Sequence, residues 1–134
     1  MQINFINDIE FILREKLPIN KRQQIISAYN LFRETVRNVQ TTMLQIITRK
    51  LQISQNEFFE INRSIERKLS ELLNRDLTNE EIVFLRQNLA TMNNSLIQAQ
   101  SNFMNKIFLI TRLTQSEIEA LLRKHNLTID ITNG

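Results

Sequence analysis

The chain has 134 residues, of which 42% are hydrophobic and 23% are charged, and its formal net charge is +3. It contains one proline (Pro18), one glycine (Gly134) and no cysteine, which excludes a turn-rich β-architecture, a disulfide framework and a thiolate metal site. No apolar run approaches the length needed to span a bilayer, so we expect a cytoplasmic protein with no membrane span. We expect residues 1–126 to form a single helical domain and residues 127–134 a short flexible tail.

A first helix is predicted over residues 3–16. Ile3, Ile6 and Ile9 recur at steps of three residues, which places their side chains on one face of a helix. We expect Pro18 to end this helix, because the residue before a proline avoids the α-helical region of backbone conformation.

The second predicted helix covers residues 20–50 and carries apolar residues at alternating steps of four and three residues. This spacing is a heptad pattern, which is typical of coiled-coil-like packing. The residues on this stripe are Ile25, Tyr29, Phe32, Val36, Val39, Met43 and Ile46.

Three further helices follow, over residues 55–74, 78–112 and 115–125. The first of them is the most highly charged. The long helix over 78–112 contains no acidic residue after Glu81, and its apolar residues again recur at steps of three and four residues. That stripe consists of Ile82, Leu85, Leu89, Met92, Leu96, Ala99, Phe103, Ile107 and Ile110.

The last four predicted helices each begin with a capping box. In this arrangement an Asn, Ser or Thr side chain accepts a hydrogen bond from the amide three residues later, and a Gln or Glu at that later position reaches back to the cap. Because each box stands where a new apolar stripe begins, together they predict four helix starts. The predicted pairs are Asn20 with Gln23, Ser54 with Glu57, Thr78 with Glu81, and Thr114 with Glu117.

The fold class predicted from these features is all-α: an elongated antiparallel helical bundle with two long coiled-coil-like helices, at about 20–50 and 78–112, and three shorter helices. The long helices outrun the helix between them, and either the first and last helices or a second copy of the chain covers the surplus. The sustained heptads of the long helices favour a homo-oligomer, a dimer or higher. Whether the long helices pair within or between chains stays open. The predicted core or oligomer seam consists of Ile25, Phe32, Val36, Val39, Met43, Leu85, Leu89, Met92, Leu96 and Phe103.

The sequence lacks the residue patterns of common enzyme sites. His125 is the only histidine and stands near the end of a predicted helix, where a capping or solvent-exposed role is expected. There is no Glu-x-x-His pair for a di-metal centre, and the only glycine is terminal, so there is no glycine-rich phosphate loop. We therefore expect no catalytic residues, no cofactor and no metal site.

A modest basic face on the second helix raises the alternative of nucleic-acid binding. Lys21, Arg22, Arg33 and Arg37 are candidates for phosphate contacts, which would be nonspecific and sensitive to salt. An ordinary solvated helix face explains the same residues. The basic residues form no dense tract, so the prediction for nucleic acid is weak.

The outer face of the helix over 78–112 is polar but nearly uncharged. A long solvent-exposed helix usually carries acidic and basic residues in register, whereas amide and hydroxyl groups cost less to desolvate than charges do. This face is therefore a candidate surface for a protein partner, and a bias of the genome toward Asn and Ile is the alternative explanation. The candidate residues are Asn88, Asn94, Gln98, Asn102 and Asn105.

Together these features predict a non-enzymatic helical adaptor or assembly protein that self-associates through its heptad-patterned helices and binds a protein partner. One alternative is a helical chaperone for a client protein. Another is a nonspecific nucleic-acid-binding accessory protein.

Overall fold

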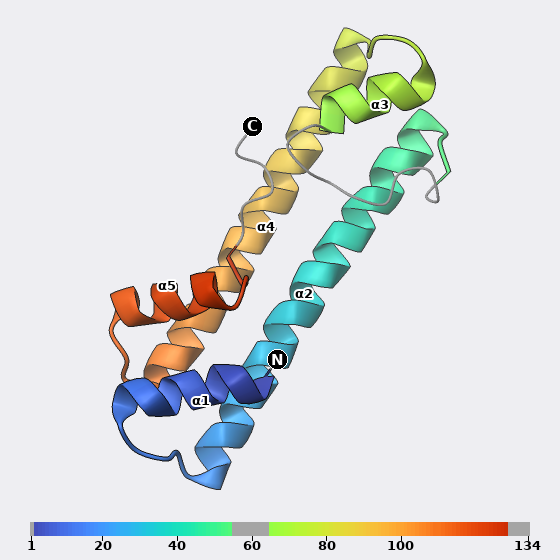
Figure 1. Cartoon of the computed structure of the whole chain (residues 1–134). Helices are drawn as coiled ribbons and strands as arrows, with labels where there is room; N and C mark the ends of the chain where they lie inside the picture. The colour runs from blue at the N-terminus through green and yellow to red at the C-terminus, as the bar shows by residue number, and fades with distance from the viewer. Residues whose placement is uncertain (1, 55–64, 129–134) are drawn as a thin grey trace. The chain divides into compact units, whose positions relative to one another are not determined.

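The computed structural model describes residues 2–54 and 65–128, and this part of the chain contains five α-helices and no strand. The all-α class predicted from the sequence is confirmed. The two long helices, α2 and α4, run antiparallel and pack against each other (Figure 1). The helices are α1 (Gln2–Leu13), α2 (Ile19–Leu51), α3 (Ile65–Leu73), α4 (Asn79–Thr111) and α5 (Gln115–Lys124).

The described residues divide into two compact units. Unit 1 contains residues 2–35 and 97–128, and unit 2 contains residues 36–54 and 65–96. Each long helix therefore contributes one part to each unit, and each unit holds its own segment of the antiparallel pair.

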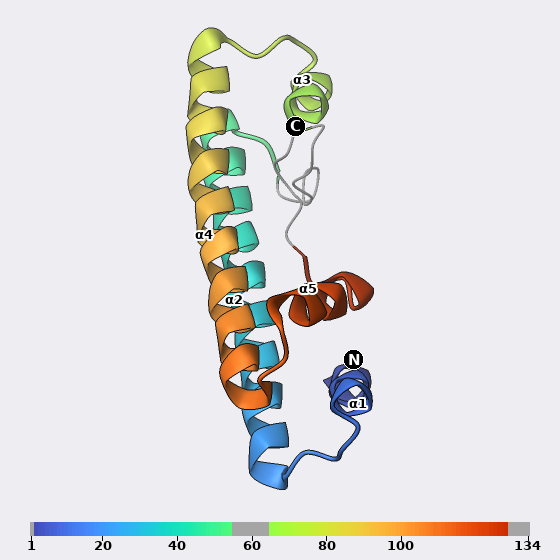
Figure 2. The same ribbon diagram turned by 90° about the vertical axis from the view of Figure 1, so that its left-hand side faces the viewer.

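In unit 1, α1 and α5 both lie on one face of the pair formed by α2 and α4 (Figure 2). The core between them is aromatic. The rings of Phe32 and Phe103 stack with centroids 4.9 Å apart, and the Phe5 ring of α1 lies 5.8 Å from Phe103 and 5.5 Å from Tyr29. Such ring pairs stabilise a core beyond the area they bury. Phe5 thus fixes α1 against both long helices.

In unit 2, the core is built from aliphatic and methionine side chains. Helix α3 contributes Ile65 and Leu69, and the long helices contribute Met43, Ile47, Leu51, Leu85, Met92 and Leu96. Ion pairs lie at the periphery: Arg86 Nε is 3.1 Å from Glu66 Oε1. Because these side chains are solvent-exposed, the pair contributes little to stability, and apolar burial holds the unit together.

Two of the predicted capping boxes are confirmed. The Thr114 hydroxyl accepts a hydrogen bond from the Glu117 amide, and the Glu117 carboxylate accepts one from the Thr114 amide. Thr78 and Glu81 make the same pair of bonds at the start of α4, at 3.1 and 2.8 Å. Arg75 also donates two hydrogen bonds to Glu81, at 2.8 and 2.9 Å. These bonds, with that of Arg75 the largest cause, lower the pKa of Glu81 to about 2.

The predicted cap at Asn20 is wrong, because α2 begins at Ile19 and Asn20 lies inside its first turn. The chain enters the helix through Pro18, whose carbonyl accepts from the Arg22 amide at 3.0 Å. Proline has no amide hydrogen that needs an acceptor, and its φ already suits a helix. Pro18 therefore stands directly before the first helical residue, in the place predicted for Asn20. The preceding Leu17 amide donates to Glu10 Oε2 of α1 at 2.7 Å.

Some predictions fall outside the described residues. Residues 55–64 include Glu57 of the second predicted box and the first half of the predicted third helix, of which the structure describes Ile65–Leu73. Of the predicted tail, only residues 127 and 128 are described, and Leu127 is buried.

Every described helix is followed within two residues by a non-glycine residue in the left-handed region. These are Arg14, Gln52, Asn74, Arg112 and Asn126, with φ between 55° and 62°. After α1, α2, α3 and α5 the next amide donates back to a carbonyl in the last turn, as in the bond from Ile53 to Thr48 at 3.0 Å. This is the Schellman arrangement, which is normally built on glycine. This arrangement ends α1 at Leu13. The end predicted from the position of Pro18 was residue 16, so the helix stops earlier than predicted.

Candidate functional site

The structure places most of the predicted seam inside the two units. Seven of its ten residues are buried within the chain, and Val36, Val39 and Leu89 are half-buried. Those buried in unit 1 are Ile25, Phe32 and Phe103, and those buried in unit 2 are Met43, Leu85, Met92 and Leu96. A second chain can reach these seven side chains only if a unit opens, so any contact surface of the closed units lies elsewhere on α2 and α4.

The buried positions leave the strict heptad toward the end of α2. Ile47 is fully buried, whereas Ile46, which the heptad places on the stripe, is half-buried. An ideal helix drifts by about 20° per heptad relative to a 3.5-residue repeat. The drift moves the inward position by one residue, from Ile46 to Ile47.

Residues of α2 and α4 in unit 1 line a groove of about 650 Å³. Ser27 and Leu31 of the groove lie on the opposite side of α2 from Tyr29, whose ring contacts Phe5 of α1. The groove is therefore on the face of the pair that is turned away from α1.

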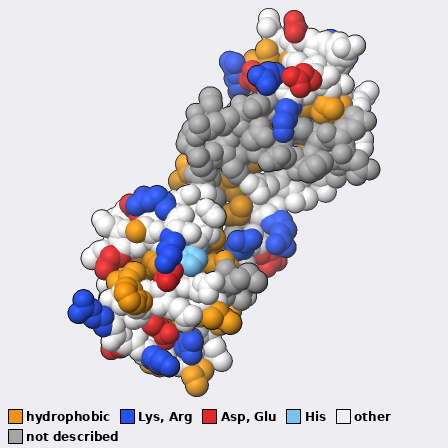
Figure 3. All heavy atoms as spheres, viewed as in Figure 1, with side chains coloured by type: hydrophobic (Ala, Val, Ile, Leu, Met, Phe, Trp, Pro, Cys, Tyr) orange, Lys and Arg blue, Asp and Glu red, His pale blue; other side chains and the backbone are white. Residues whose placement is uncertain are grey.

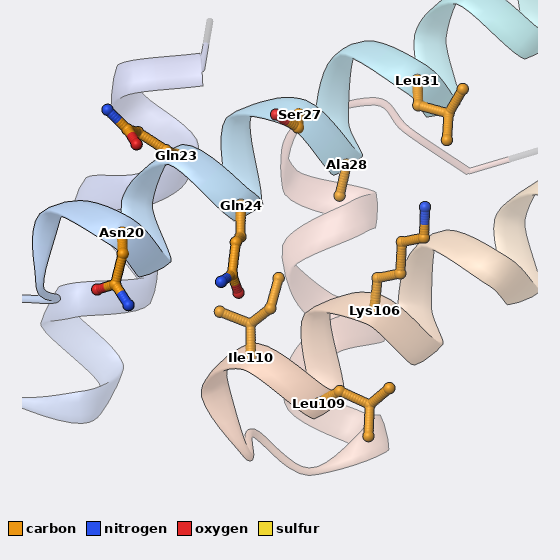
Figure 4. Close-up of a pocket in the computed structure, with 9 residues that line it drawn as sticks. All are labelled: Asn20, Gln23, Gln24, Ser27, Ala28, Leu31, Lys106, Leu109 and Ile110. Atoms are coloured by element: carbon orange, nitrogen blue, oxygen red, sulfur yellow. The ribbon is translucent and has the colours of Figure 1, made fainter.

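The apolar side chains of the groove include Leu31, which is 51% exposed, and Leu109, which is 60% exposed. In the close-up, Lys106 reaches from α4 toward α2 beside Ala28 (Figure 4). The groove is lined by Asn20, Gln23, Gln24, Ser27, Ala28, Leu31, Lys106, Leu109 and Ile110.

The groove continues along the helix pair into a smaller cavity of about 60 Å³. The two spaces share Ala28, Leu31 and Lys106, and the smaller one adds Thr35 of α2 and Asn102 of α4 to the lining. From residue 20 to residue 35 of α2 the lining extends over roughly 22 Å, at ~1.5 Å per residue. The open face of unit 1 is thus a trough about four helical turns long, with an apolar floor and an amide rim.

A second exposed apolar surface lies on another side of α4, and we call it the α4 flank: Ile97, Met104 and Phe108. Ile97 is 53% and Phe108 39% exposed, and Met104 between them is half-buried. Met104 and Phe108 line a hollow of about 470 Å³ with side chains of α5. Successive residues of a helix are rotated by about 100° around its axis, so these three positions lie on one side of α4. The groove positions of α4 lie on a different side of the helix.

The predicted partner-surface residues are distributed over these features. Asn102 lines the smaller cavity beside the groove, and Asn105 lines the hollow next to the α4 flank. Gln98 is exposed and donates to Asn102 Oδ1 at 3.0 Å, and Asn94 is exposed on the same helix. Asn88 lies in unit 2, where its side chain is half-buried and donates to the Phe84 carbonyl at 2.8 Å.

The candidate phosphate-binding residues do not gather into one described site. Lys21 and Arg37 are exposed, and they belong to different units. Arg22 is half-buried with its Nε 3.9 Å from Glu10 Oε2, and the Arg33 guanidinium lies over the Tyr29 ring at 5.9 Å. Two of the four cations therefore already interact with side chains of the chain itself. Nucleic-acid binding stays a prediction.

A cluster of charged side chains links α1 to α5 in unit 1, on the side of the helix pair that these two helices cover. Asp8 Oδ2 lies 2.9 Å from Lys124 Nζ and 2.7 Å from His125 Nε2. The Lys124 hydrogen bond, followed by that of His125, lowers the pKa of Asp8 below its usual value against the opposing effect of burial. Basic and acidic side chains are spread over this side of the unit (Figure 3).

His125 takes the capping position predicted for it, at the C-cap of α5. The alternative of solvent exposure is wrong, because its side chain is only 10% exposed and its ring meets the Phe5 ring edge-on, with centroids 5.3 Å apart. Asp8 is 117 residues away from His125 in the sequence. Its contact with the His125 ring, and the burial of that ring, could therefore not be predicted from the sequence.

The groove itself was not predicted from the sequence. Leu109 and Lys106 lie outside the heptad stripe, where solvent-facing residues are expected. The available signal was the apolar Leu31 beside the stripe of the second predicted helix, because an apolar residue off the stripe widens the apolar surface of a helix. Only the structure shows that Leu31 and Leu109 line one groove.

Comparison with known proteins gives no match to a family model, to a curated protein or to a solved structure. Over residues 2–54 and 65–128, no helix combines the length and apolarity that crossing a membrane requires. In the same residues, no group of three or more His, Cys, Asp or Glu side chains has the arrangement of a metal site.

Proposed function

We propose that the protein is a non-enzymatic helical adaptor that binds a protein partner and self-associates, using the outer faces of its long helices. One observation carries this proposal: unit 1 keeps large apolar side chains exposed on two sides of α4, although its core is already formed by other residues. Leu109 beside the groove and Ile97 on the α4 flank are both more than half exposed. Exposed apolar surfaces rimmed by polar groups are typical of protein-interaction sites.

The presence of two surfaces favours an adaptor over a chaperone with one client. The groove and the α4 flank lie on different sides of the same helix, so two proteins can occupy them together. The polar residues that line the groove, its adjoining cavity and the hollow are amides and hydroxyls, including Asn102, Asn105 and Ser101, apart from Lys106 in the groove. On the α4 flank the Arg112 guanidinium lies over the Phe108 ring at 5.4 Å. Amides and hydroxyls lose less on desolvation than charges do, which suits surfaces that are covered and uncovered reversibly.

We assign self-association to the α4 flank and partner binding to the groove. Sedimentation equilibrium from micromolar to near-millimolar protein tests self-association. We expect the mass to rise to at least twice that of one chain. Ile97→Asp should weaken the association by about tenfold or more, because it places a charge in the contact.

Ser95→Asp is the matched control, since it adds the same charge to α4 at an exposed polar position on the opposite side of the helix from Ile97. It should leave the association almost unchanged. Both variants change exposed residues, so circular dichroism should show wild-type helix content. A wild-type protein that remains monomeric at every concentration would remove self-association from the proposal.

A further inference from the structure

We propose that the groove of unit 1 binds an amphipathic helix of a partner protein, one that carries a carboxylate on the edge of its apolar face. This inference rests on the proposed function and specifies the partner that the groove accepts. Its physical basis is the shape of the groove together with the charge of Lys106.

The shape fits a helix. Two antiparallel helices form the walls, and the residues that line the groove recur on each wall at helical spacing. On α2 they include Gln24, Ala28, Leu31 and Thr35, and on α4 they include Asn102, Lys106 and Leu109. A trough about four turns long matches an amphipathic helix of about 15 residues, whose apolar face fits between two such ridges. A compact small molecule would leave most of this length uncovered.

The charge selects an acidic helix. Lys106 is the only charged residue that lines the groove and its adjoining cavity. Within the described residues no ion pair to Lys106 is found, and α4 contains no acidic residue after Glu81. On α2, the first acidic residue in the sequence is Glu34, and it lines neither the groove nor its adjoining cavity. The charged residues of α2 that precede it, Lys21, Arg22 and Arg33, are all basic. The ammonium group therefore lies in apolar and amide surroundings where a bound helix would have to supply its carboxylate.

The same charge argues against a second copy of this chain in the groove. In a symmetric dimer the same surface meets itself, so two grooves that each carry Lys106 and no acidic lining residue would face each other. Like charges brought together at an interface disfavour the contact. The groove thus complements an acidic partner better than it complements itself.

The test uses two synthetic amphipathic peptides of about 16 residues, a length chosen from the helix rise of ~1.5 Å. Both carry leucines at steps of three and four residues. One has a glutamate at the centre of the apolar edge, and the other has a lysine there. Binding is measured by fluorescence anisotropy with wild-type protein, with Lys106→Glu and with Lys16→Glu. Lys16 is exposed between α1 and α2 and does not line the groove, so its replacement controls for net charge.

We expect wild-type protein to bind the glutamate peptide at least about tenfold more tightly than the lysine peptide. Lys106→Glu should reverse this order, and Lys16→Glu should keep it. Lys106 is exposed, so its replacement should not unfold the protein, and circular dichroism of each variant verifies this. The proposal is overturned if neither peptide binds at near-millimolar concentration, or if Lys106→Glu leaves the order unchanged.

A third outcome assigns the groove to a second copy. If the glutamate peptide lowers the mass of the wild-type oligomer, the groove is the self-association surface and the proposal is overturned. The Ile97→Asp variant separates this inference from the proposed function. If Ile97→Asp loses self-association but still binds the glutamate peptide, the groove is a separate binding site, as proposed. If the protein self-associates but does not bind the peptide, the inference about the groove is refuted and the proposed self-association stands.

Discussion

Unit 1 and unit 2 are built on segments of the same two helices, yet they are completed differently. In unit 1, two short helices cover one face of the pair through an aromatic core centred on Phe5, Phe32 and Phe103. In unit 2, α3 is the one short helix described, and it adds Ile65 and Leu69 to an aliphatic core. The groove and the α4 flank both lie in unit 1. Both proposed contact surfaces therefore lie in the unit whose core is aromatic, and sites that need precise geometry are best carried by well-packed elements.

The largest expected effect comes from breaking the aromatic core. Phe103→Ala should destabilise the protein by about 3–5 kcal/mol, because it removes a buried ring and leaves a cavity. Phe103 is only 2% exposed. Urea unfolding measures the loss of stability, and hydrogen exchange shows where it acts. We expect faster exchange in the amides of unit 1 than in those of unit 2.

Phe108→Ala is the control, since this phenylalanine lies on the same helix with its side chain partly exposed. Its replacement should cost much less. The complementary variant Leu69→Ala should instead speed exchange in α3 and the unit 2 segments. Equal effects of Phe103→Ala on both units would contradict the division of the fold into two units.

A smaller effect is expected from the helix caps, which work alike in both units. Thr114→Ala in unit 1 and Thr78→Ala in unit 2 should each cost about 1 kcal/mol, because each leaves an amide of the first turn without its acceptor. Asn20→Ala should cost less, since Asn20 lies within the first turn of α2. Thermal unfolding compares the three variants. A cost at Asn20 equal to that at Thr78 would restore the capping role predicted from the sequence.

These caps also show what the sequence could and could not predict. Helix starts at Thr78 and Thr114 were predicted correctly, because a capping box is local and depends on side chains three residues apart. Helix ends were less predictable, since the usual glycine is absent and Arg14 or Gln52 takes the left-handed position.

The groove was still harder to predict from the sequence than the helix ends. Its formation depends on which face of the pair α1 and α5 cover, and that choice is made by long-range contacts. Phe5 against Tyr29 is one such contact, and Asp8 against His125 is another. Hydrophobic periodicity predicted most of the inward residues of α2 and α4, but it does not identify the side of the pair that stays open.

A modest gain in stability is expected from replacing a left-handed residue in unit 2. Gln52 has φ 58°, a conformation that costs a non-glycine residue about 1 kcal/mol or more. Gln52→Gly should raise the free energy of unfolding by up to about 1 kcal/mol, less the entropy that glycine adds to the unfolded chain. Asn74→Gly is the control, because asparagine tolerates this conformation better. A larger gain at Asn74 would contradict the explanation.

The smallest effect concerns pH and belongs to unit 1. Because the folded pKa of Asp8 is lowered from 3.8, its ion pair stabilises the fold above that pH and loses this contribution as the pH falls through the folded pKa. Asp8→Asn should lower the melting temperature at neutral pH, and the difference from wild type should shrink as the pH falls below 3.8. A difference that stays constant with pH would assign the effect to packing alone.

The central claim is that the uncovered face of the helix pair in unit 1 is a contact surface. Hydrogen-exchange mass spectrometry of the full chain, with and without the glutamate peptide, tests it most directly. We predict that the peptide protects amides within residues 20–35 of α2 and 99–110 of α4, the two stretches that line the groove, and leaves α1 and α5 unchanged. Protection confined to α1 and α5, or none at saturating peptide, would contradict the claim.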